Sequence, residues 1–220
     1  MPIYNAPLAD MKFILNDVFN ADQFWQSNEN LAHVDSATAE AILEEMAKFA
    51  QNVTLPLNRT GDEEGATFSN GAVTTPAGFK EAFKQYAEGG WIGLAADEEW
   101  GGQGMPKMLT VLADEMLFAT NPSFMLYPLL SVGAGMALNS YASQEQKETY
   151  LPKIYSGEWS GTMCLTEPHA GTDLGIIKTK AERNEDGTYN ITGTKIFITG
   201  GDHDLAENII HLVLAKTPDA

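Results

Sequence analysis

The sequence predicts an α+β protein, in which an all-α helical N-terminal domain is followed by an incomplete antiparallel β-domain. Up to residue 157, apolar residues recur every three or four positions, as they do on the buried face of a helix. From Trp159 onward, short segments alternate apolar and polar residues between glycine-containing turns, which is typical of strands. We therefore expect an N-terminal extension with one short helix over residues 1–35, a helical domain over 36–157 and the first part of a β-domain over 158–220.

Two helices and a loop are expected before residue 75. The first helix carries an apolar stripe formed by Met11, Ile14, Leu15, Val18 and Phe19. We expect this segment to dock on the rest of the protein through Phe13, Phe19 and Phe24. The second helix begins after Ser36 and stops before Pro56, because proline has no N–H to continue the helix. Residues 57–75 are interpreted as a loop, since glycines punctuate a polar segment there.

The rest of the chain is expected to hold four more helices and then strands. One helix opens at Pro76, where the missing N–H costs nothing. Two buried helices follow between residues 106 and 142, divided at Asn121. Ser143 and Gln146 match the capping-box pattern that begins a last helix. Strands are expected over residues 176–182, 189–192, 195–199 and 209–215.

Composition excludes several classes of function. The chain has 13 Lys and Arg against 30 Asp and Glu, and its formal charge of −17 argues against nucleic acid or an anionic membrane as a partner. A single cysteine, Cys164, excludes an internal disulfide and a cysteine zinc site. No apolar run approaches the roughly 18 residues of a membrane span, and no secretory signal begins the chain, so we expect a cytoplasmic protein. Adjacent residues point apart, so Asp202-His203-Asp204 is interpreted as a solvated turn and no metal is expected.

The strongest functional signal is the segment from Met163 to Asp173, which reads Met-Cys-Leu-Thr-Glu-Pro-His-Ala-Gly-Thr-Asp. An apolar strand end leads here into a polar loop whose small residues let the backbone approach a ligand. Thr166 and Thr172 add hydroxyl groups. A second polar patch, Phe197 to Gly201, follows another expected strand. These features suit a flat, polar, partly anionic ligand, and nothing in them matches the nucleophile elbow of a hydrolase.

These motifs resemble the signature of the acyl-CoA dehydrogenase family, in which Thr-Glu-Pro precedes a small residue, Gly, Ser or Thr, and Asp. Leu94 to Gly104 resembles the glycine-rich loop of the family, Tyr150-Leu151-Pro152 its last helix before the β-domain, and Gly193 to Gly200 its second flavin-contact strand. The resemblance covers residues 37–216. The arm Tyr4-Asn5-Ala6-Pro7 resembles the extension of a subgroup that includes the methylmercaptopropionyl-CoA dehydrogenases.

The resemblance implies a flavoprotein with FAD bound between a β-barrel-like middle domain and a C-terminal four-helix domain. The implied flavin contacts are Met163, Cys164, the backbone of Leu165 and the hydroxyl of Thr166 on one side, and Phe197, Ile198 and Thr199 on the other. The Thr199 hydroxyl is implied to lie near the N5 edge of the flavin. Many relatives carry tryptophan where Phe197 stands. Thr172 is implied to lie near the pantetheine of an acyl-CoA substrate.

The implied activity is that of an oxidoreductase of fatty acid metabolism, which removes a proton and a hydride from an acyl-CoA thioester and passes electrons to an electron-transfer flavoprotein. The family's base is a glutamate of the C-terminal domain, so no catalytic residue is assigned and the base is expected beyond residue 220. Glu167 lies inside the signature, but it is interpreted as structural because a loop carboxylate beside Pro168 shows no sign of desolvation. The parent protein is expected to be a homo-oligomer.

The sequence suggests that the chain is an N-terminal fragment whose isolated form is inactive. We expect a β-domain that stops midway to leave residues 209–215 poorly ordered or paired with another chain. Two alternatives stay open at this point. One is a non-enzymatic module that binds flavin or acyl-CoA. The other is a relative of the DNA-associated adaptive-response flavoproteins, although the net charge disfavours it.

Overall fold

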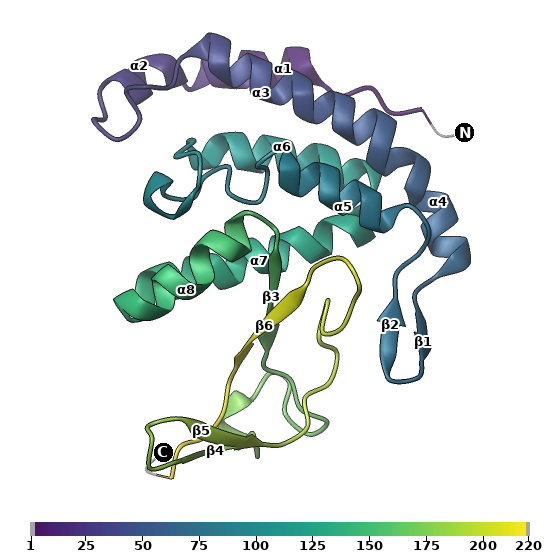
Figure 1. Cartoon of the computed structure of the whole chain (residues 1–220). Coiled ribbons are helices and arrows are strands. Elements are labelled where there is room, and N and C mark those ends of the chain that lie inside the picture. Colours follow the sequence, from purple (N-terminus) through teal and green to yellow (C-terminus); the bar gives the residue numbers. More distant parts are fainter. Residues whose placement is uncertain (1–2, 219–220) are drawn as a thin grey trace.

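The computed structural model describes residues 3–218 and confirms the α+β fold. Figure 1 shows layers of helices above a small group of strands that reaches away from them. The helices are α1 (Leu8–Phe13), α2 (Ala21–Gln26), α3 (Ser36–Phe49), α4 (Leu55–Glu64), α5 (Phe79–Glu88), α6 (Lys107–Thr120), α7 (Pro122–Tyr141) and α8 (Gln144–Tyr155). The strands are β1 (Thr67–Ser69), β2 (Ala72–Thr74), β3 (Trp159–Cys164), β4 (Lys180–Arg183), β5 (Tyr189–Thr192) and β6 (Asn208–Val213).

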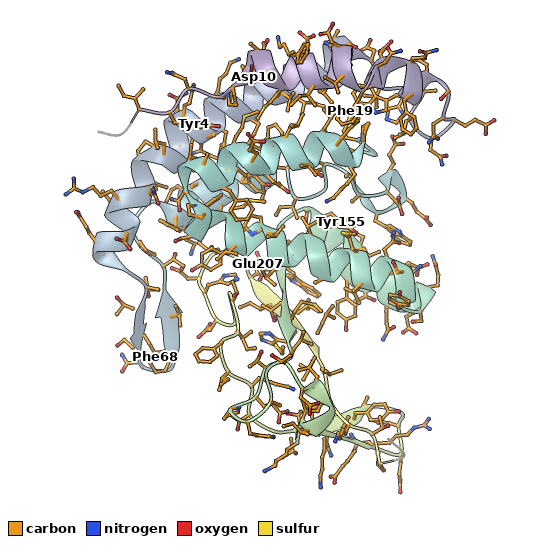
Figure 2. The ribbon with its side chains drawn as sticks, turned by 180° about the vertical axis from the view of Figure 1, so that it is seen from behind. Tyr4, Asp10, Phe19, Phe68, Tyr155 and Glu207 are labelled. Atoms are coloured by element: carbon orange, nitrogen blue, oxygen red, sulfur yellow. The ribbon has the colours of Figure 1, made fainter. Side chains whose placement is uncertain are left out.

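The N-terminal extension holds two α-helices, α1 and α2, joined through a π-helical turn, η1 (Ile14–Val18), where the sequence predicted one helix. Its buried anchors are Met11, Leu15 and Trp25. The predicted docking through Phe13, Phe19 and Phe24 was wrong, because all three phenyl rings are exposed. Figure 2 labels Phe19 on this layer. Met11 and Leu15 lie one helical turn apart, and that narrow stripe is enough to hold the segment.

The helix after residue 36 continues past the predicted stop. The π-helical turn η2 (Ala50–Thr54) carries α3 into α4, and Pro56 lies in the first turn of α4, where no N–H is needed. The interpretation of residues 57–75 as a loop was therefore wrong. The segment after α4 is a β1–β2 hairpin, whose turn residues Asn70 and Gly71 both have positive φ, as a tight hairpin turn requires.

The core lies between α3, α5, α6 and α7. The α5 helix begins at Phe79, three residues after the predicted start, and α6 and α7 meet at Asn121, whose side chain accepts from the Phe124 N–H at 3.0 Å. The capping box at α8 is confirmed, because Ser143 and Gln146 exchange side chain and backbone hydrogen bonds. The large side chains that are fully buried include Leu43, Met46, Phe83, Leu109, Met116, Leu117 and Phe124.

The β-part contains one antiparallel pair, β4–β5, and one parallel pair, β3–β6. The strand expected over residues 209–215 is found as β6, over Asn208–Val213. The expectation that this segment would be poorly ordered or paired with another chain was wrong, because β6 pairs with β3 over its whole length, from Trp159↔Asn208 to Cys164↔Val213. Residues 195–199 form no strand. The β3 strand packs on α7, where a Cβ at Gly161 would overlap the methyl group of Ala134. Within residues 3–218, no helix has both the length and the apolar character that a bilayer crossing needs.

Candidate functional site

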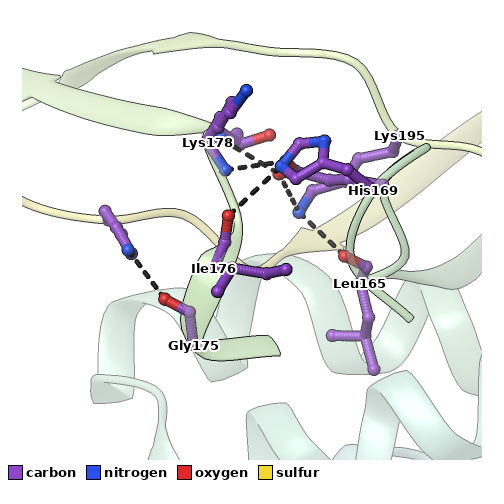
Figure 3. A network of polar contacts seen from close by, with 9 residues as sticks. Leu165, His169, Gly175, Ile176, Lys178 and Lys195 are labelled. Atoms are coloured by element: carbon purple, nitrogen blue, oxygen red, sulfur yellow. Dashed lines mark hydrogen bonds and ion pairs between the residues drawn. The ribbon is translucent and has the colours of Figure 1, made fainter. Parts of the chain in front are cut away.

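The structure brings together the two segments that the sequence singled out. The Ile196 N–H donates to the Thr166 carbonyl at 3.0 Å, just past the end of β3. The Lys195 ammonium donates to the Leu165 carbonyl at 2.9 Å, and Figure 3 shows this side chain reaching across between the two segments. Because these bonds tie backbone to backbone and side chain to backbone, residues 163–166 and 195–199 form one surface.

Glu167 is the centre of a polar network behind that surface. Its side chain is only 3% exposed, and its carboxylate accepts from the Lys178 N–H at 2.7 Å, the Thr179 N–H at 3.0 Å and Lys195 at 3.0 Å. The network also includes His169, whose Nε2 lies 3.5 Å from the Glu167 carboxylate (Figure 3). Glu167 thus links β3, the segment before β4 and residue 195.

The protonation state of Glu167 follows from this network. Burial alone would raise its pKa, but the donors from Thr179, Lys178 and Lys195 outweigh burial and hold the pKa well below its usual range. The sequence analysis had expected a loop carboxylate without desolvation, and the structure instead buries it. A buried carboxylate whose two oxygens both accept hydrogen bonds and whose pKa is held low is a weak base at neutral pH.

Several residues on the same surface are exposed, and some of them are apolar. Phe197 is 89% exposed and has φ of +58°, a left-handed backbone conformation that is strained for a bulky aromatic residue. Met163, in the first of the two segments, is 37% exposed. The hydroxyls of Thr166 and Thr199 make no hydrogen bond to the part of the chain that the structure describes. An exposed ring and free hydroxyls together suit a flat ligand with a polar edge.

The remaining predicted site residues lie in different positions. Cys164 is buried, and its Sγ lies 3.4 Å from the Thr162 hydroxyl and 3.8 Å from His211 Nδ1, so only its backbone is near the surface. Ile198 is half-buried, and Thr172 is exposed in the loop before η4 (Leu174–Ile176). The structure therefore joins Leu165 and Thr166 to residues 195 and 196, whereas Thr172 makes no hydrogen bond to either segment within the described residues.

The sequence analysis missed a second polar cluster, which anchors residues 200–207. His203 is buried rather than solvated, and its Nδ1 accepts from the Leu205 N–H at 3.1 Å. Its Nε2 is therefore the protonated nitrogen and donates to the Ser160 hydroxyl at 2.9 Å. Asp204 accepts from the Thr75 N–H at 3.0 Å and from its hydroxyl at 2.7 Å. Both residues therefore hold the chain in place between the helical part and the β-part.

Burial also determines the charge of the cluster. It lowers the pKa of His203 below its usual value, although Asp202 and Asp204 oppose this, so the ring is neutral at pH 7. No local pattern in the sequence pointed to this burial, because it depends on contacts with Ser160 and Thr75, which lie far away in the sequence.

Comparisons with known proteins show which family this chain resembles. The model of the acyl-CoA dehydrogenase N-terminal domain matches residues 36–158, and that of the acyl-CoA dehydrogenase middle domain matches residues 162–220. The 3-methylmercaptopropionyl-CoA dehydrogenase of Ruegeria pomeroyi is 45% identical over 99% of this chain and 37% of its own length. A butyryl-CoA dehydrogenase of Syntrophomonas wolfei is 39% identical over 99% of this chain and 36% of its own length.

A solved structure is also similar. The acyl-CoA dehydrogenase of Bacillus anthracis, in complex with FAD, matches with a TM-score of 0.69 and 27% identity over 84% of this chain and 30% of that chain. The chain spans 37% and 36% of the two curated relatives named above, little more than a third of each. With both family models in sequence order and the fold in agreement, this chain belongs to the acyl-CoA dehydrogenase family.

Proposed function

We propose that this chain forms the N-terminal part of an FAD-dependent acyl-CoA dehydrogenase, which oxidises an acyl-CoA thioester to the 2,3-enoyl-CoA. One observation carries the proposal. The end of β3 and residues 195–199 are bonded into one surface, on which Phe197 is 89% exposed in a strained conformation beside free hydroxyl groups. Backbone strain of this kind clusters at ligand sites, where the surrounding structure holds it in place.

The residues on this surface fit FAD. The flavin ring system is flat and apolar across its faces and polar along its pyrimidine edge, which matches an exposed phenyl ring beside hydroxyl groups. We assign the pyrimidine edge to the backbone of Met163, Cys164 and Leu165 and to the Thr166 hydroxyl. We assign the other contact to Phe197, Ile198 and Thr199. Thr172 is assigned to the pantetheine of the substrate.

The chain's own part in the reaction is binding and positioning. When bound, FAD supplies the acceptor for the hydride that leaves the β-carbon of the thioester. Lys195 and Glu167 keep the two flavin segments in register, since one ammonium bonds both Leu165 and Glu167. The α-proton needs a carboxylate base, and Glu167 is already occupied by its donors. Glu167 is therefore not assigned as the base, and we propose that the base belongs to another part of the parent protein, as the family resemblance implies.

The same proposal extends to the domain boundary, the electron acceptor and the behaviour of the isolated chain. We place the domain boundary at residues 157–158 and propose an electron-transfer flavoprotein as the electron acceptor of a cytoplasmic, homo-oligomeric parent. The isolated chain is proposed to bind flavin weakly and to lack dehydrogenase activity. The relatives named above give no support to a non-enzymatic module or to a DNA-associated relative.

Equilibrium titration of FAD fluorescence with the purified chain tests the flavin site. We expect saturable quenching that weakens in Phe197→Ala and in Thr166→Val, because each change removes one proposed contact. Thr192→Val is the matched control, since Thr192 is exposed on β5. The absence of saturable binding, or equal affinities for all four proteins, would refute the site. Reduction of an artificial acceptor by the isolated chain with any acyl-CoA would refute the placement of the base.

A further inference from the structure

The loop of residues 171–175 carries Thr172 and follows a tight turn after β3. In that turn, Glu167 and Ala170 exchange two backbone hydrogen bonds, of 2.9 and 3.1 Å. The first half of the loop has little support, because a Cβ on Gly171 would meet nothing within 4 Å, and Thr172 is exposed and makes no hydrogen bond to the described residues. The position of Thr172 therefore depends on how the two ends of the loop are held.

The side chain of His169 joins the start of this loop to its end. Its Nε2 lies 3.2 Å from the carbonyl oxygen of Ile176, and Figure 3 shows this hydrogen bond as a dashed line between the two residues. The same nitrogen lies 3.5 Å from the Glu167 carboxylate. A bond between two ends of a loop removes conformational freedom from the residues between them, which here include Thr172.

The other bonds of this region leave that role to His169. The Asp173 carboxylate accepts from the Gly175 N–H at 3.0 Å, and Lys216 donates to the Gly175 carbonyl at 2.8 Å, so both bonds lie at the far end of the loop. The Glu167 carboxylate reaches past the loop, to the N–H groups of residues 178 and 179. His169 closes the loop earlier, at residue 176.

The groups around Nε2 of His169 determine which ring nitrogen holds the proton. Its two neighbours are the Ile176 carbonyl and the Glu167 carboxylate. The carboxylate is ionised, because its hydrogen-bond donors hold the pKa of Glu167 well below its usual range. A carbonyl oxygen and an ionised carboxylate accept hydrogen bonds and donate none. Nε2 therefore carries the proton and donates it to the Ile176 carbonyl.

We propose that His169 is a positioning residue for substrate binding, because its Nε2–H fixes the loop of residues 171–175 and with it the place of Thr172. The contact between Thr172 and the pantetheine of an acyl-CoA rests on the proposed function. The hydrogen bond from His169 and its effect on the loop do not rest on it.

Two amide substitutions separate the position of the donor from its chemistry. A glutamine side chain carries its N–H donor at about the distance of Nε2 from the backbone, whereas an asparagine side chain is one carbon shorter. We therefore expect His169→Gln to keep the hydrogen bond to Ile176 and His169→Asn to lose it. His33→Asn, at an exposed histidine of the N-terminal extension, is the matched control.

Amide exchange and ¹⁵N relaxation of the purified chain test the hydrogen bond. The Ile177 N–H donates to the Leu174 carbonyl at 3.3 Å, and it follows the residue that His169 holds. In His169→Asn we expect this amide to exchange about fivefold faster, which is the effect of losing one hydrogen bond. We expect the order parameter of Thr172 to fall from about 0.85 to about 0.6. His169→Gln and His33→Asn are expected to match the unchanged chain.

Titration with free pantetheine tests the link to the substrate. We expect a saturable shift of the Thr172 amide signal, with an affinity about fivefold lower in His169→Asn than in the unchanged chain or in His169→Gln. Equal exchange at Ile177 in the three proteins, equal affinities for pantetheine, or failure of the glutamine variant to match the unchanged chain would overturn the role of His169. Expected exchange results without any pantetheine shift in the unchanged chain would overturn the assignment of Thr172 to the substrate and not the hydrogen bond of His169.

Discussion

Replacing Asp114 by asparagine is expected to stabilise the folded chain at pH 7.5 and to have little effect at pH 4. Burial raises the pKa of Asp114 from 3.8 to about 6 in the folded chain, and Lys107 offsets only part of this. Between pH 4 and pH 6 the folded state therefore holds a proton that the unfolded state has lost. Stability falls as pH rises through this window, and the whole penalty is present above pH 6.

The magnitude follows from the size of that shift. A shift of about two pKa units at 1.36 kcal/mol each sets an upper bound of about 3 kcal/mol. Asp114 is only half-buried, so solvent screening reduces this to about 1–2 kcal/mol. Asparagine has nearly the same shape and no charge, so it removes the penalty. For a chain of this size, the gain corresponds to a rise in melting temperature of about 3–6 °C.

Thermal unfolding followed by circular dichroism at pH 7.5 and pH 4 measures the effect. Each variant is compared with the unchanged chain at the same pH, so that the other carboxylates cancel. Glu115→Gln, which removes a charge from the same helix turn at an exposed position, is expected to shift the melting temperature little at either pH. The reasoning fails if Asp114→Asn melts at or below the temperature of the unchanged chain at pH 7.5. It also fails if the gain is as large at pH 4 as at pH 7.5.

Three further changes test the packing, the helix start and the polar network. Gly161→Ala is expected to destabilise the chain by about 1–3 kcal/mol in urea unfolding, and Ala134→Gly to restore most of it, because the two side chains overlap. A lack of rescue would contradict this. Ser143→Ala is expected to cost about 1 kcal/mol in the same assay, since it opens the capping box, and no loss would contradict it. Glu167→Gln is expected to speed amide exchange at Ile196 and to weaken FAD binding. Unchanged exchange would show that the network does not hold residues 195–199.

Local signals predicted the parts of the fold that depend on neighbours in sequence. The capping box at Ser143 and the break at Asn121 were visible because side chain and backbone partners lie three residues apart. The continuation of α4 was not visible, since Pro56 and Gly61 read as breakers. Gly61 is instead the point where α4 approaches the Phe79 ring, and a Cβ there would lie 2.6 Å from it. Such a contact depends on tertiary packing, which a local pattern does not contain.

The β-part shows the same limit over a longer distance. A short apolar run identified the strand at residues 209–215, but the choice of β3 as its parallel partner depends on how α7 and residues 200–207 place the two strands. Within the site, the motif identified Thr166 and Phe197 as neighbours of a ligand. It carried no sign that Phe197, which follows two residues bonded to the end of β3, would adopt a positive φ.

A comparison of Glu167 with Asp114 indicates that the surroundings of an acidic residue, and not its membership of a motif, decide its protonation state. Glu167 stands in the signature, yet its donors keep its pKa low and leave it no free oxygen for a substrate. Asp114 belongs to no motif, yet it lines a cavity between the helices, and burial raises its pKa. Hydrogen-bond donors therefore keep Glu167 ionised, whereas desolvation favours the protonated form of Asp114. The surroundings of each carboxylate, and not its place in the sequence pattern, set the direction in which its pKa moves.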